Sequence, residues 1–419
     1  MLRPRISIVF TQVPTEKYPE RKDTFTLNFV HECKIHSSWK NLSDTCKLIF
    51  PKKIYIQDEF GGLYDLSGQS QVGDNGLPQR NMYAGTASNF ASPFFLRGDK
   101  VKVSAGYWSS PNPNDDMKVI FEGFVARINP KMPLEIECED NMYLLKQAKV
   151  KNQVFTGTVE SMVQSLITTY APQLSYKAAP GVSTNIGNFR TMNETFCQIL
   201  ERLRKDYFIE SFFRGDKLFA SPFAYYSAFT PAATPVFKLT SQDANIIDNG
   251  DKLVFTRSDD VRISLKCFSF EKQKITGITN LGVQKTQKKR LEAVVGEPDG
   301  EIRTAYFWNV GTVENLIKMG KARLPRYQYE GFRGSFPTFG DWNPETGGAL
   351  VNHGDIVQII DRYLPERNGL YFVKSVERIF NMSGYKQEVE LDLRADTTFT
   401  NPDGTTSNIL DDYYANGCY

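Results

Sequence analysis

The sequence predicts a mainly β protein in which an α+β insert separates two all-β domains that arose by internal duplication. Aromatic residues make up 13% of the 419-residue chain, with 30 Phe and 20 Tyr, and such residues are enriched in strands. Short runs that alternate apolar and polar residues occupy both ends of the chain, whereas helical periodicity is concentrated in its middle. A chain of this length is expected to divide into about two to four domains.

Residues 1–150 are predicted to form the first barrel domain. Strand-like alternation runs through RISIVFTQV, TFTLNFVHECKIHSS and TCKLIFPKKIYIQ, and it returns in KVKVSAGY, VIFEGFVARI and LEIECED. Between these groups, residues 58–94 are rich in Gly, Ser, Asn and Gln. A loop of this length is unusual inside a compact domain, so we expect it to contact a partner.

Residues 151–235 are predicted to form the α+β insert. TVESMVQSLITTYA has apolar residues at helical spacing, with Thr158 as the expected cap. A second helix is expected in TMNETFCQILERLRKDY, where Thr191 and Glu194 match a capping box. FIESFFRGDKLFAS is typical of a β-hairpin that turns at residues 215–216.

Residues 236–395 are predicted to form the second barrel domain. Strand-like runs appear in DKLVFT, VRISLKCFSF, RLEAVVG and RTAYFWNV, and one helix is expected in TVENLIKMGKARL. Further strands are expected in YEGFRGSFPTF, DIVQIID, GLYFVKSVERIF and YKQEVELDLR. Residues 396–419 are polar and rich in Thr and Asn, so we expect an extension beyond the last domain.

A three-strand pattern that occurs twice predicts the duplication. LRGDKVKVS at 96–104 and NHGDIVQII at 352–360 each place Gly-Asp before alternating apolar residues. A Pro/Asn-rich loop and two more strands follow in each case, and this alignment matches Val125 with Val376. Any antiparallel meander would give a similar pattern, so the alternative is two unrelated domains.

The charge balance predicts neither nucleic-acid binding nor membrane association. The chain carries 50 Lys and Arg against 48 Asp and Glu, a formal net charge of +2, so no bulk field draws it to DNA or to an acidic membrane. The N-terminal apolar run is too short for a signal peptide, and no stretch approaches the roughly 18 apolar residues of a transmembrane helix. We therefore expect a protein without a membrane anchor that is made in the cytoplasm.

No catalytic, cofactor-binding or metal-binding residue is predicted. The six cysteines lie at irregular intervals without a CxxC pair, which favours free thiols. His31 and His36 are five residues apart and so lie on opposite faces of a strand, whereas a metal site needs converging ligands. GxSxG, HExxH, Walker and GxGxxG motifs are missing from the sequence.

Two short features admit a functional alternative. Arg-Gly-Asp occurs at 97–99 and 214–216, where we favour turns over an adhesion motif. A glycosidase needs only two carboxylates across a cleft, and GEPDGE and CED offer carboxylates that we expect to be solvated. An enzyme of cell-wall or glycan chemistry is therefore the alternative to a binding or structural protein.

Phrases from all three predicted domains carry a resemblance to a known family. These phrases are LRGDKVKVSAGY, FEGFVARI and PLEIECEDNMYLLK, then NETFCQILERLRKDYFIESFFRGDKLF, then YEGFRGSFPTFG, HGDIVQI and ERNGLYFVKSVERIF. Together they resemble the central baseplate hub proteins of bacteriophage tails. These are hubs of the late control protein D type, related to hubs of contractile injection systems. The resemblance covers about residues 1–395 and rests on domain order and strand phrases.

The resemblance implies tail-tube-like barrels and a structural role in the virion, not an enzyme. Three such chains form a ring of six barrels that joins the hexameric tail tube to the trimeric spike or tail tip. The implied state is a homotrimer around a channel for DNA or the tape-measure protein, without specific nucleic-acid binding. Implied partners are the tube protein, the spike or tail-tip protein and other baseplate proteins, in a tail baseplate assembled in the host cytoplasm.

Within this picture, two polar segments are the expected contacts with partners. Residues 58–94 and 396–419 cannot supply a core of their own, so we expect them to order against the tube or the spike. The alternative function is a peptidoglycan or glycan hydrolase of a tail tip built on β-domains. The sequence does not distinguish a contractile from a non-contractile tail.

Overall fold

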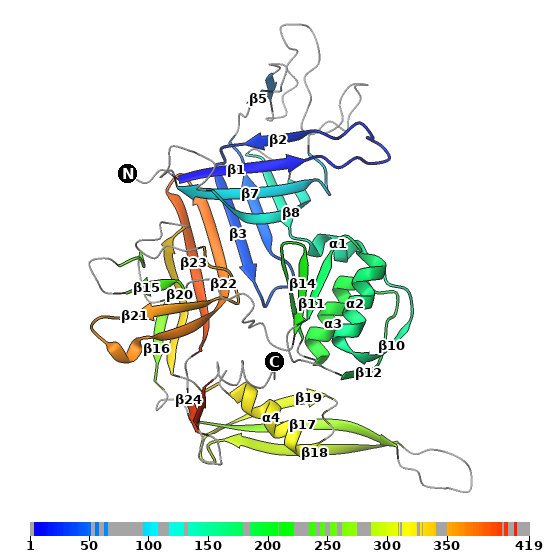
Figure 1. Cartoon of the computed structure of the whole chain (residues 1–419), viewed down its shortest axis with the longest axis vertical. Coiled ribbons are helices and arrows are strands. Elements are labelled where there is room, and N and C mark those ends of the chain that lie inside the picture. Colours follow the sequence, from blue (N-terminus) through cyan, green and yellow to red (C-terminus); the bar gives the residue numbers. More distant parts are fainter. Residues whose placement is uncertain are drawn as a thin grey trace.

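The computed structural model describes most of the chain, and strands dominate it (Figure 1). The described residues are 4–51, 55–57, 63–65, 95–107, 117–129, 133–178, 185–207, 209–221, 234–239, 244–247, 252–257, 262–274, 286–308, 310, 312–324, 327–328, 330–340, 350–395, 398–400 and 406–408. Within them, three α-helices gather in the middle of the chain and a fourth lies against a small separate sheet. The mainly β class with an α+β insert is confirmed.

The first β-domain is an antiparallel run of strands in the order β2-β1-β7-β8-β9-β4-β3. Its strands are β1 (Pro4–Thr11), β2 (Thr24–Leu27), β3 (Glu32–Ser38), β4 (Thr45–Ile49), β7 (Lys100–Tyr107), β8 (Lys118–Asn129) and β9 (Glu135–Glu139). Alternate side chains point inward, and Ile8, Val103 and Val125 are fully buried in one core. Of the predicted loop 58–94, only β6 (Leu63–Asp65), which pairs with β5 (Tyr55–Gln57), lies within the described residues.

The second β-domain continues the same sheet. Its elements are β15 (Val236–Lys238), β16 (Leu253–Thr256), β20 (Gly331–Phe339), β21 (Ile356–Ile360), the 3-10 helix η4 (Pro365–Arg367), β22 (Gly369–Asn381) and β23 (Gly384–Arg394). The first half of β22 pairs with β21, and its second half pairs with β3 of the first β-domain. The two β-domains are therefore linked in one 13-stranded sheet, because β22 is long enough to pair with strands of both domains.

The two β-domains repeat one arrangement of six strands. The neighbours β3-β4-β9-β8-β7-β1 correspond to β16-β20-β23-β22-β21-β15, and the strands of each set follow the same order along the chain. One pairing differs, since β1 and β7 are antiparallel whereas β15 and β21 are parallel. An internal duplication stays a prediction, which this repeated order supports.

The Gly-Asp turn aligns the two copies residue by residue. The pair at 98–99 exchanges two backbone hydrogen bonds of 2.8 Å with Val125, and the pair at 354–355 exchanges bonds of 2.7 and 2.9 Å with Val373. Both glycines have positive φ, 96° and 80°, which favours glycine. The match of Val125 with Val376 is therefore wrong by three residues. A bulge between Val373 and Val376 lets both side chains be buried. The apolar pattern alone therefore allows Val125 to be aligned with either residue.

The insert has a core of its own. It contains α1 (Met142–Gln147), β10 (Val154–Thr158), α2 (Val159–Tyr170), β11 (Ser175–Ala178), β12 (Asn185–Arg190), α3 (Phe196–Tyr207), β13 (Glu210–Arg214) and β14 (Lys217–Ser221). Two small sheets, β10-β12 and β11-β14-β13, share a single apolar cluster with the helices. Thr158 caps α2 as predicted, because its hydroxyl accepts a 3.3 Å hydrogen bond from the N–H of Ser161.

The cap of α3 lies one turn later than the sequence indicated. The N–H of Thr195 donates to Gln198 Oε1 at 2.8 Å, and the N–H of Gln198 donates back to Thr195 Oγ1 at 3.3 Å. The predicted pair of Thr191 and Glu194 is wrong. Asn193 has a φ of 52°, which a right-handed helix cannot include. The helix therefore cannot begin after Thr191 and begins after Thr195.

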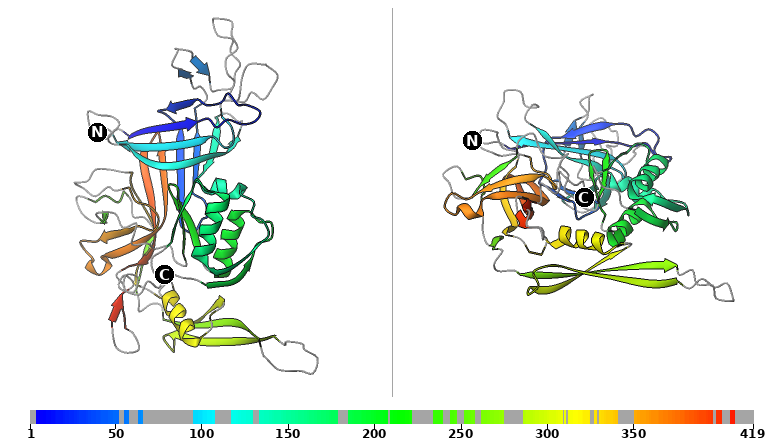
Figure 2. Two further views of the ribbon diagram at one scale, coloured as in Figure 1. Left: turned by 45° about the vertical axis from the view of Figure 1, so that its right-hand side comes forward. Right: turned by 60° about the horizontal axis from the view of Figure 1, so that its bottom comes forward.

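Residues 262–328 form an outer module that leaves the main sheet between β16 and β20 (Figure 2). Its strands β17 (Ile263–Lys274), β18 (Thr286–Gly296) and β19 (Glu301–Trp308) form a separate sheet in the order β18-β17-β19, covered on one face by α4 (Val313–Arg323). The predicted place of these strands in the second β-domain is therefore wrong, because alternation predicts a strand but not the sheet that it joins. A Cβ at Gly320 would lie 2.6 Å from Cys267 Sγ, so this glycine permits the close helix–sheet contact.

Beyond the second β-domain, the described chain ends in a short hairpin. Strand β24 (Thr398–Thr400) pairs with β25 (Thr406–Asn408). The rest of the predicted extension 396–419 lies outside the described residues. In both views the hairpin lies near the end of the outer module at which β17 begins (Figure 1, Figure 2).

Leu200→Ala should destabilise the insert by about 2–5 kcal/mol, because the fully buried Leu200 would leave a cavity. Hydrogen exchange followed by mass spectrometry should show lost protection in α2, α3 and β13, with the strands of the first β-domain unchanged. Glu201→Ala, at an exposed position of the same helix, is the control. Equal loss of protection in the first β-domain would show that the two cores unfold as one unit.

Candidate functional site

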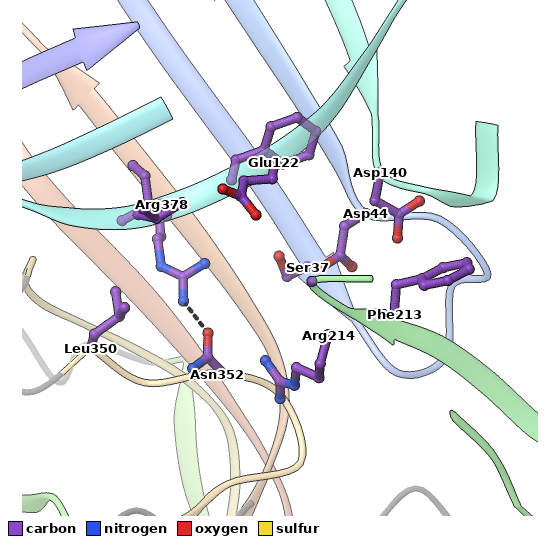
Figure 3. Close-up of a pocket in the computed structure, with 13 residues that line it drawn as sticks. Ser37, Asp44, Glu122, Asp140, Phe213, Arg214, Leu350, Asn352 and Arg378 are labelled. Atoms are coloured by element: carbon purple, nitrogen blue, oxygen red, sulfur yellow. Dashed lines mark hydrogen bonds between the residues drawn. The ribbon is translucent and has the colours of Figure 1, made fainter. Parts of the chain in front are cut away.

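The two β-domains and the insert meet around a cavity of about 290 Å³ (Figure 3). Asp44 reaches it from the β3–β4 turn, and Asp140 from the segment before α1. Arg214 comes from the tip of hairpin β13–β14, and Asn352 and Arg378 come from the second β-domain. Charged side chains from three parts of the chain therefore face one space, which we call the junction.

Arg214 links the insert to the second β-domain. Its Nη2 donates a hydrogen bond to the backbone carbonyl of His353 and lies 4.0 Å from Asp355 Oδ1. Burial lowers the pKa of Arg214, and the carboxylates of Asp355 and Asp44 act against that shift. The guanidinium stays charged, so its contacts hold the tip of the hairpin against the loop before β21.

His353 lies fully buried inside the junction. Its ring packs edge-on against Phe212, with centroids 4.7 Å apart and an interplanar angle of 85°. The distance of 3.8 Å from Nε2 to Asp44 Oδ2 is too long for a hydrogen bond. Burial, followed by the positive charge of Arg214, lowers the pKa of His353 to about 4. The imidazole is therefore neutral at pH 7.

Two carboxyl groups of the first β-domain carry different charges. Asp44 accepts a 3.1 Å hydrogen bond from the N–H of Ser38, and Asp140 accepts bonds of 3.0 Å from Ser43 Oγ and from the N–H of Met142. Burial, followed by the charge of Asp44, raises the pKa of Asp140 to about 8. Burial also acts to raise the pKa of Asp44, but its hydrogen bond from the Ser37 side chain and the positive charge of Arg214 help to lower it overall. At pH 7 Asp44 is ionised and Asp140 holds a proton.

Asp355, the last residue of the second Gly-Asp turn, lies close to a cation of the insert, Arg214. Its Oδ2 accepts a 2.7 Å hydrogen bond from the N–H of Asn352, and burial raises its pKa to about 6 against the pull of Arg214. The matching Asp99 accepts hydrogen bonds of 2.8 and 2.5 Å from Arg21 of its own domain. The first copy of the turn is therefore self-contained, whereas the second copy depends on the insert.

Arg378 ties the loop before β21 to the strand that joins the two β-domains. Its Nη2 donates to the carbonyl of Val351 at 2.6 Å and to Asn352 Oδ1 at 2.9 Å (Figure 3). Its Cα partner across the strand pair is Ile35 of β3. The residue is 2% exposed, so these hydrogen bonds offset part of the cost of taking a cation out of water.

The junction suits a rigid joint better than a catalytic centre. An ionised carboxylate beside a protonated one is an arrangement that acid–base catalysts use. Here, however, Asp44 and Asp140 hold backbone N–H groups, and Glu122 at the rim pairs with Lys102 at 3.0 Å. Each carboxylate thus has a structural partner within its own domain.

The sequence predicted no site residues, so it did not identify the junction. Both Arg-Gly-Asp tripeptides, 97–99 and 214–216, are turns as predicted. The Gly-Asp repeat pointed to Asp355, but no sequence signal marked Asp44, Asp140 or Arg214 as neighbours, because they come from three distant segments. Only the tertiary structure brings them together.

Several other sequence expectations concern single residues. His31 is exposed and His36 half-buried, and no group of three His, Cys, Asp or Glu within the described ranges could hold a metal ion. The five cysteines in those ranges are buried free thiols, whereas Cys418 lies outside them. In the same part of the chain, no helix is long and apolar enough to cross a membrane.

Comparison with known proteins places the fold. No protein-family model and no curated protein matches the sequence. A tail protein from Neisseria meningitidis MC58 is 14% identical at a TM-score of 0.57, over 93% of this chain and 96% of that one. The 43 kDa tail protein of prophage MuSo2 from Shewanella oneidensis is 14% identical at a TM-score of 0.55, over 93% and 98%. A chain of the Francisella PdpA–VgrG complex in its half-lidded form is 10% identical at a TM-score of 0.50, over 96% and 60%.

At such identities the similarity concerns the fold. The chain has the fold of phage tail proteins and of a chain in a VgrG complex, along nearly its whole length. This confirms the fold that the resemblance in strand phrases and domain order implied.

The free energy of unfolding should fall by about 1–2 kcal/mol as the pH rises from about 6.5 to 8. The folded pKa of Asp140, about 8, exceeds its ordinary value of 3.8, so the folded state holds an extra proton in this range and loses that stabilisation as the pH passes through 8. Asp355, with a pKa of about 6, and His353, neutral in both states above about pH 6.5, add little slope in this range.

Thermal unfolding of the wild type and of Asp140→Asn across that pH range checks the assignment. The asparagine is neutral in both states, so the melting temperature of Asp140→Asn should change less with pH. Asp299→Asn, at an exposed position of the outer module, should keep the wild-type slope. A wild-type slope in Asp140→Asn would assign the titration to another group.

Arg214→Met should destabilise the contact between the insert and the second β-domain by about 1–3 kcal/mol, because Asp355 would lose a nearby cation and the carbonyl of His353 would lose its hydrogen bond. Asp355→Asn in the same chain should restore part of the loss. Denaturant unfolding of the two single variants and the double variant measures this coupling. Lys217→Met, exposed on the same hairpin, is the control, and strictly additive effects of the two substitutions would contradict the link.

Proposed function

We propose that this protein is the central hub of a tail baseplate, in which three copies form a ring that joins the hexameric tail tube to the trimeric spike or tail tip. The repeated six-strand arrangement is the observation that carries the proposal. Two similar β-domains per chain give six per trimer, which matches a six-fold tube while keeping three-fold symmetry for the spike. The tail-protein fold along 93% of the chain supports the same role.

Within this proposal, the two β-domains are copies produced by internal duplication. The shared strand order and the shared Gly-Asp turn support common ancestry more strongly than the strand pattern alone. Among the described strands, the 13-stranded sheet ends at β16, at β2 and at β15, and these edges are surfaces through which copies can associate in a ring. A ring also removes exposed strand edges that would otherwise promote aggregation.

The proposed partners are the tube protein, the spike or tail-tip protein and other baseplate proteins. The ring surrounds a channel for DNA or the tape-measure protein, and a net charge of +2 suits passage without tight binding. Residues 58–94 and 396–419 contact the tube and the spike. The mature protein resides in the tail baseplate of the virion after assembly in the host cytoplasm.

The proposed role is structural and not enzymatic. The paired carboxyl groups of Asp44 and Asp140 are the observation that favours the alternative, a hydrolase of peptidoglycan or glycans. Their bonds to backbone N–H groups instead support a joint between domains. Release of soluble fragments from purified peptidoglycan, abolished by Asp140→Asn, would favour the hydrolase.

Light scattering on the purified chain, alone and with its tube and spike proteins, should give a trimer or a monomer that trimerises on mixing. Electron microscopy of the product should show a ring with a central channel. Val254→Lys should weaken assembly by about tenfold, because Val254 is 57% exposed on the edge strand β16.

Met192→Lys is the matched control, since Met192 is 65% exposed on the insert, away from the sheet edges. It should assemble like the wild type. A stable monomer that responds to neither partner would remove the hub assignment. Salt-dependent DNA binding in the micromolar range would do the same.

A further inference from the structure

The outer module has one sheet face covered by α4 and a second face that carries exposed apolar side chains. Even-numbered residues of β17, β18 and β19 share this second face, because cross-strand partners lie on the same side of a sheet. Ile302 is 70% exposed, Val294 57% and Tyr306 53%. Exposed apolar groups gathered on one face mark a docking surface. We call these residues, with Phe268 and Phe270, the outer face.

Cations frame the aromatic part of the outer face. The Arg290 guanidinium lies 4.1 Å from the ring centroid of Phe268, and Lys266 Nζ lies 5.5 Å from it. Glu292 pairs with both cations, at 2.7 Å from Lys266 and 3.3 Å from Arg290. The sequence of the β17–β18 hairpin, residues 271–290, is also basic, with Lys and Arg at six positions against a single Glu.

The ring geometry argues against stacking of a nucleobase or a sugar on this face. Tyr306 stacks on Phe268 with centroids 5.7 Å apart and on Phe270 with centroids 6.4 Å apart, at interplanar angles of 28° and 15°. Arg290 covers Phe268 as well. Ring faces occupied in this way are not open platforms of the kind that single-stranded nucleic acids use. An apolar peptide with acidic side chains suits the outer face better.

The C-terminal segment of the chain has that composition. Residues 396–419 contain four Asp and no Lys or Arg, and the sequence from 409 onward is ILDDYYANGCY. In an extended strand, Asp411 lies between Ile409 and Tyr413, and Asp412 lies between Leu410 and Tyr414. The segment therefore complements a face that combines Ile302, Val294 and Tyr306 with Lys266 and Arg290.

The end of the described chain is also within reach. The described chain ends at Asn408 in β25, whose partner β24 lies near the end of the module at which β17 begins (Figure 1, Figure 2). The 11 residues from 409 to 419 span up to about 36 Å when extended. The eight residues of β19 span about 26 Å. The segment is long enough to cross the sheet.

We propose that residues 409–419 dock on the outer face of the outer module of their own chain, with apolar contacts to Ile302, Val294 and Tyr306. Lys266 and Arg290 lie where they can pair with Asp411 and Asp412. The docked segment shields the exposed apolar groups from solvent. This contact within one chain forms in the unassembled protein, and residues 409–419 exchange it for the tube or the spike when the proposed assembly forms. The contact itself does not depend on the hub function.

Cysteine trapping in the full-length chain tests the proposal with a thiol that the sequence already provides. Cys418 lies in the docking segment, and the other five cysteines are buried. Ile302→Cys places a partner thiol in the middle of the outer face, and oxidised glutathione serves as the oxidant. Non-reducing electrophoresis and peptide mass spectrometry identify the product. We expect a disulfide within one chain, formed at least about tenfold faster than in Met382→Cys, because docking raises the local thiol concentration.

Met382 is a matched control because it is 88% exposed on the β22–β23 turn of the second β-domain. In the Ile302→Cys chain, Asp411→Lys with Asp412→Lys should slow trapping severalfold, and added salt should reduce that difference. Asn416→Lys adds positive charge without removing an acid and should have little effect. Equal trapping rates at Ile302 and Met382 would overturn the proposal, as would a product that joins two chains.

Discussion

The pairing of β3 with β22 is the contact on which the rest of the architecture depends. It joins residues 32–38 to residues 375–381 and turns two sheets into one. The long strand β22 makes this possible, since β21 uses its first half and β3 its second. The junction lies where these strands meet the insert, with Arg378 of β22 on its wall. The relative position of the two β-domains is therefore set by backbone hydrogen bonds, with buried side chains adding specificity.

The Gly-Asp turns show how a repeated element can acquire a new dependence. In the first β-domain, Asp99 pairs with Arg21 of the same domain, whereas Asp355 has Arg214 of the insert as a nearby cation. Both carboxyl groups are buried, and a buried carboxylate without a nearby cation is costly. The second turn thus favours one position of the insert over others. Electrostatics thus contributes to the geometry of the joint between the insert and the second β-domain.

Sequence reasoning was reliable where a signal is local. The strands of both β-domains, the cap at Thr158 and the turn at residues 215–216 follow from periodicity and turn chemistry. It failed where neighbours are chosen by tertiary structure. Strands 263–308 looked like barrel strands but form a separate sheet, and a bulge between Val373 and Val376 misled the alignment of the copies. The junction could not be predicted, because its charged residues come from three segments with no common motif.

The pairing of β3 with β22 also has a consequence for synthesis on the ribosome. The hydroxyl of Ser38 donates to the carbonyl of Lys374 across 336 residues of sequence. At about 5–20 residues per second, translation of that interval takes roughly 17–70 s. During this time, the edge of β3 that later pairs with β22 has no partner, although the other strands of the first β-domain have already been synthesised. An unpaired strand edge is a template for pairing with another chain, so this interval is the one in which the nascent chain is most exposed to aggregation.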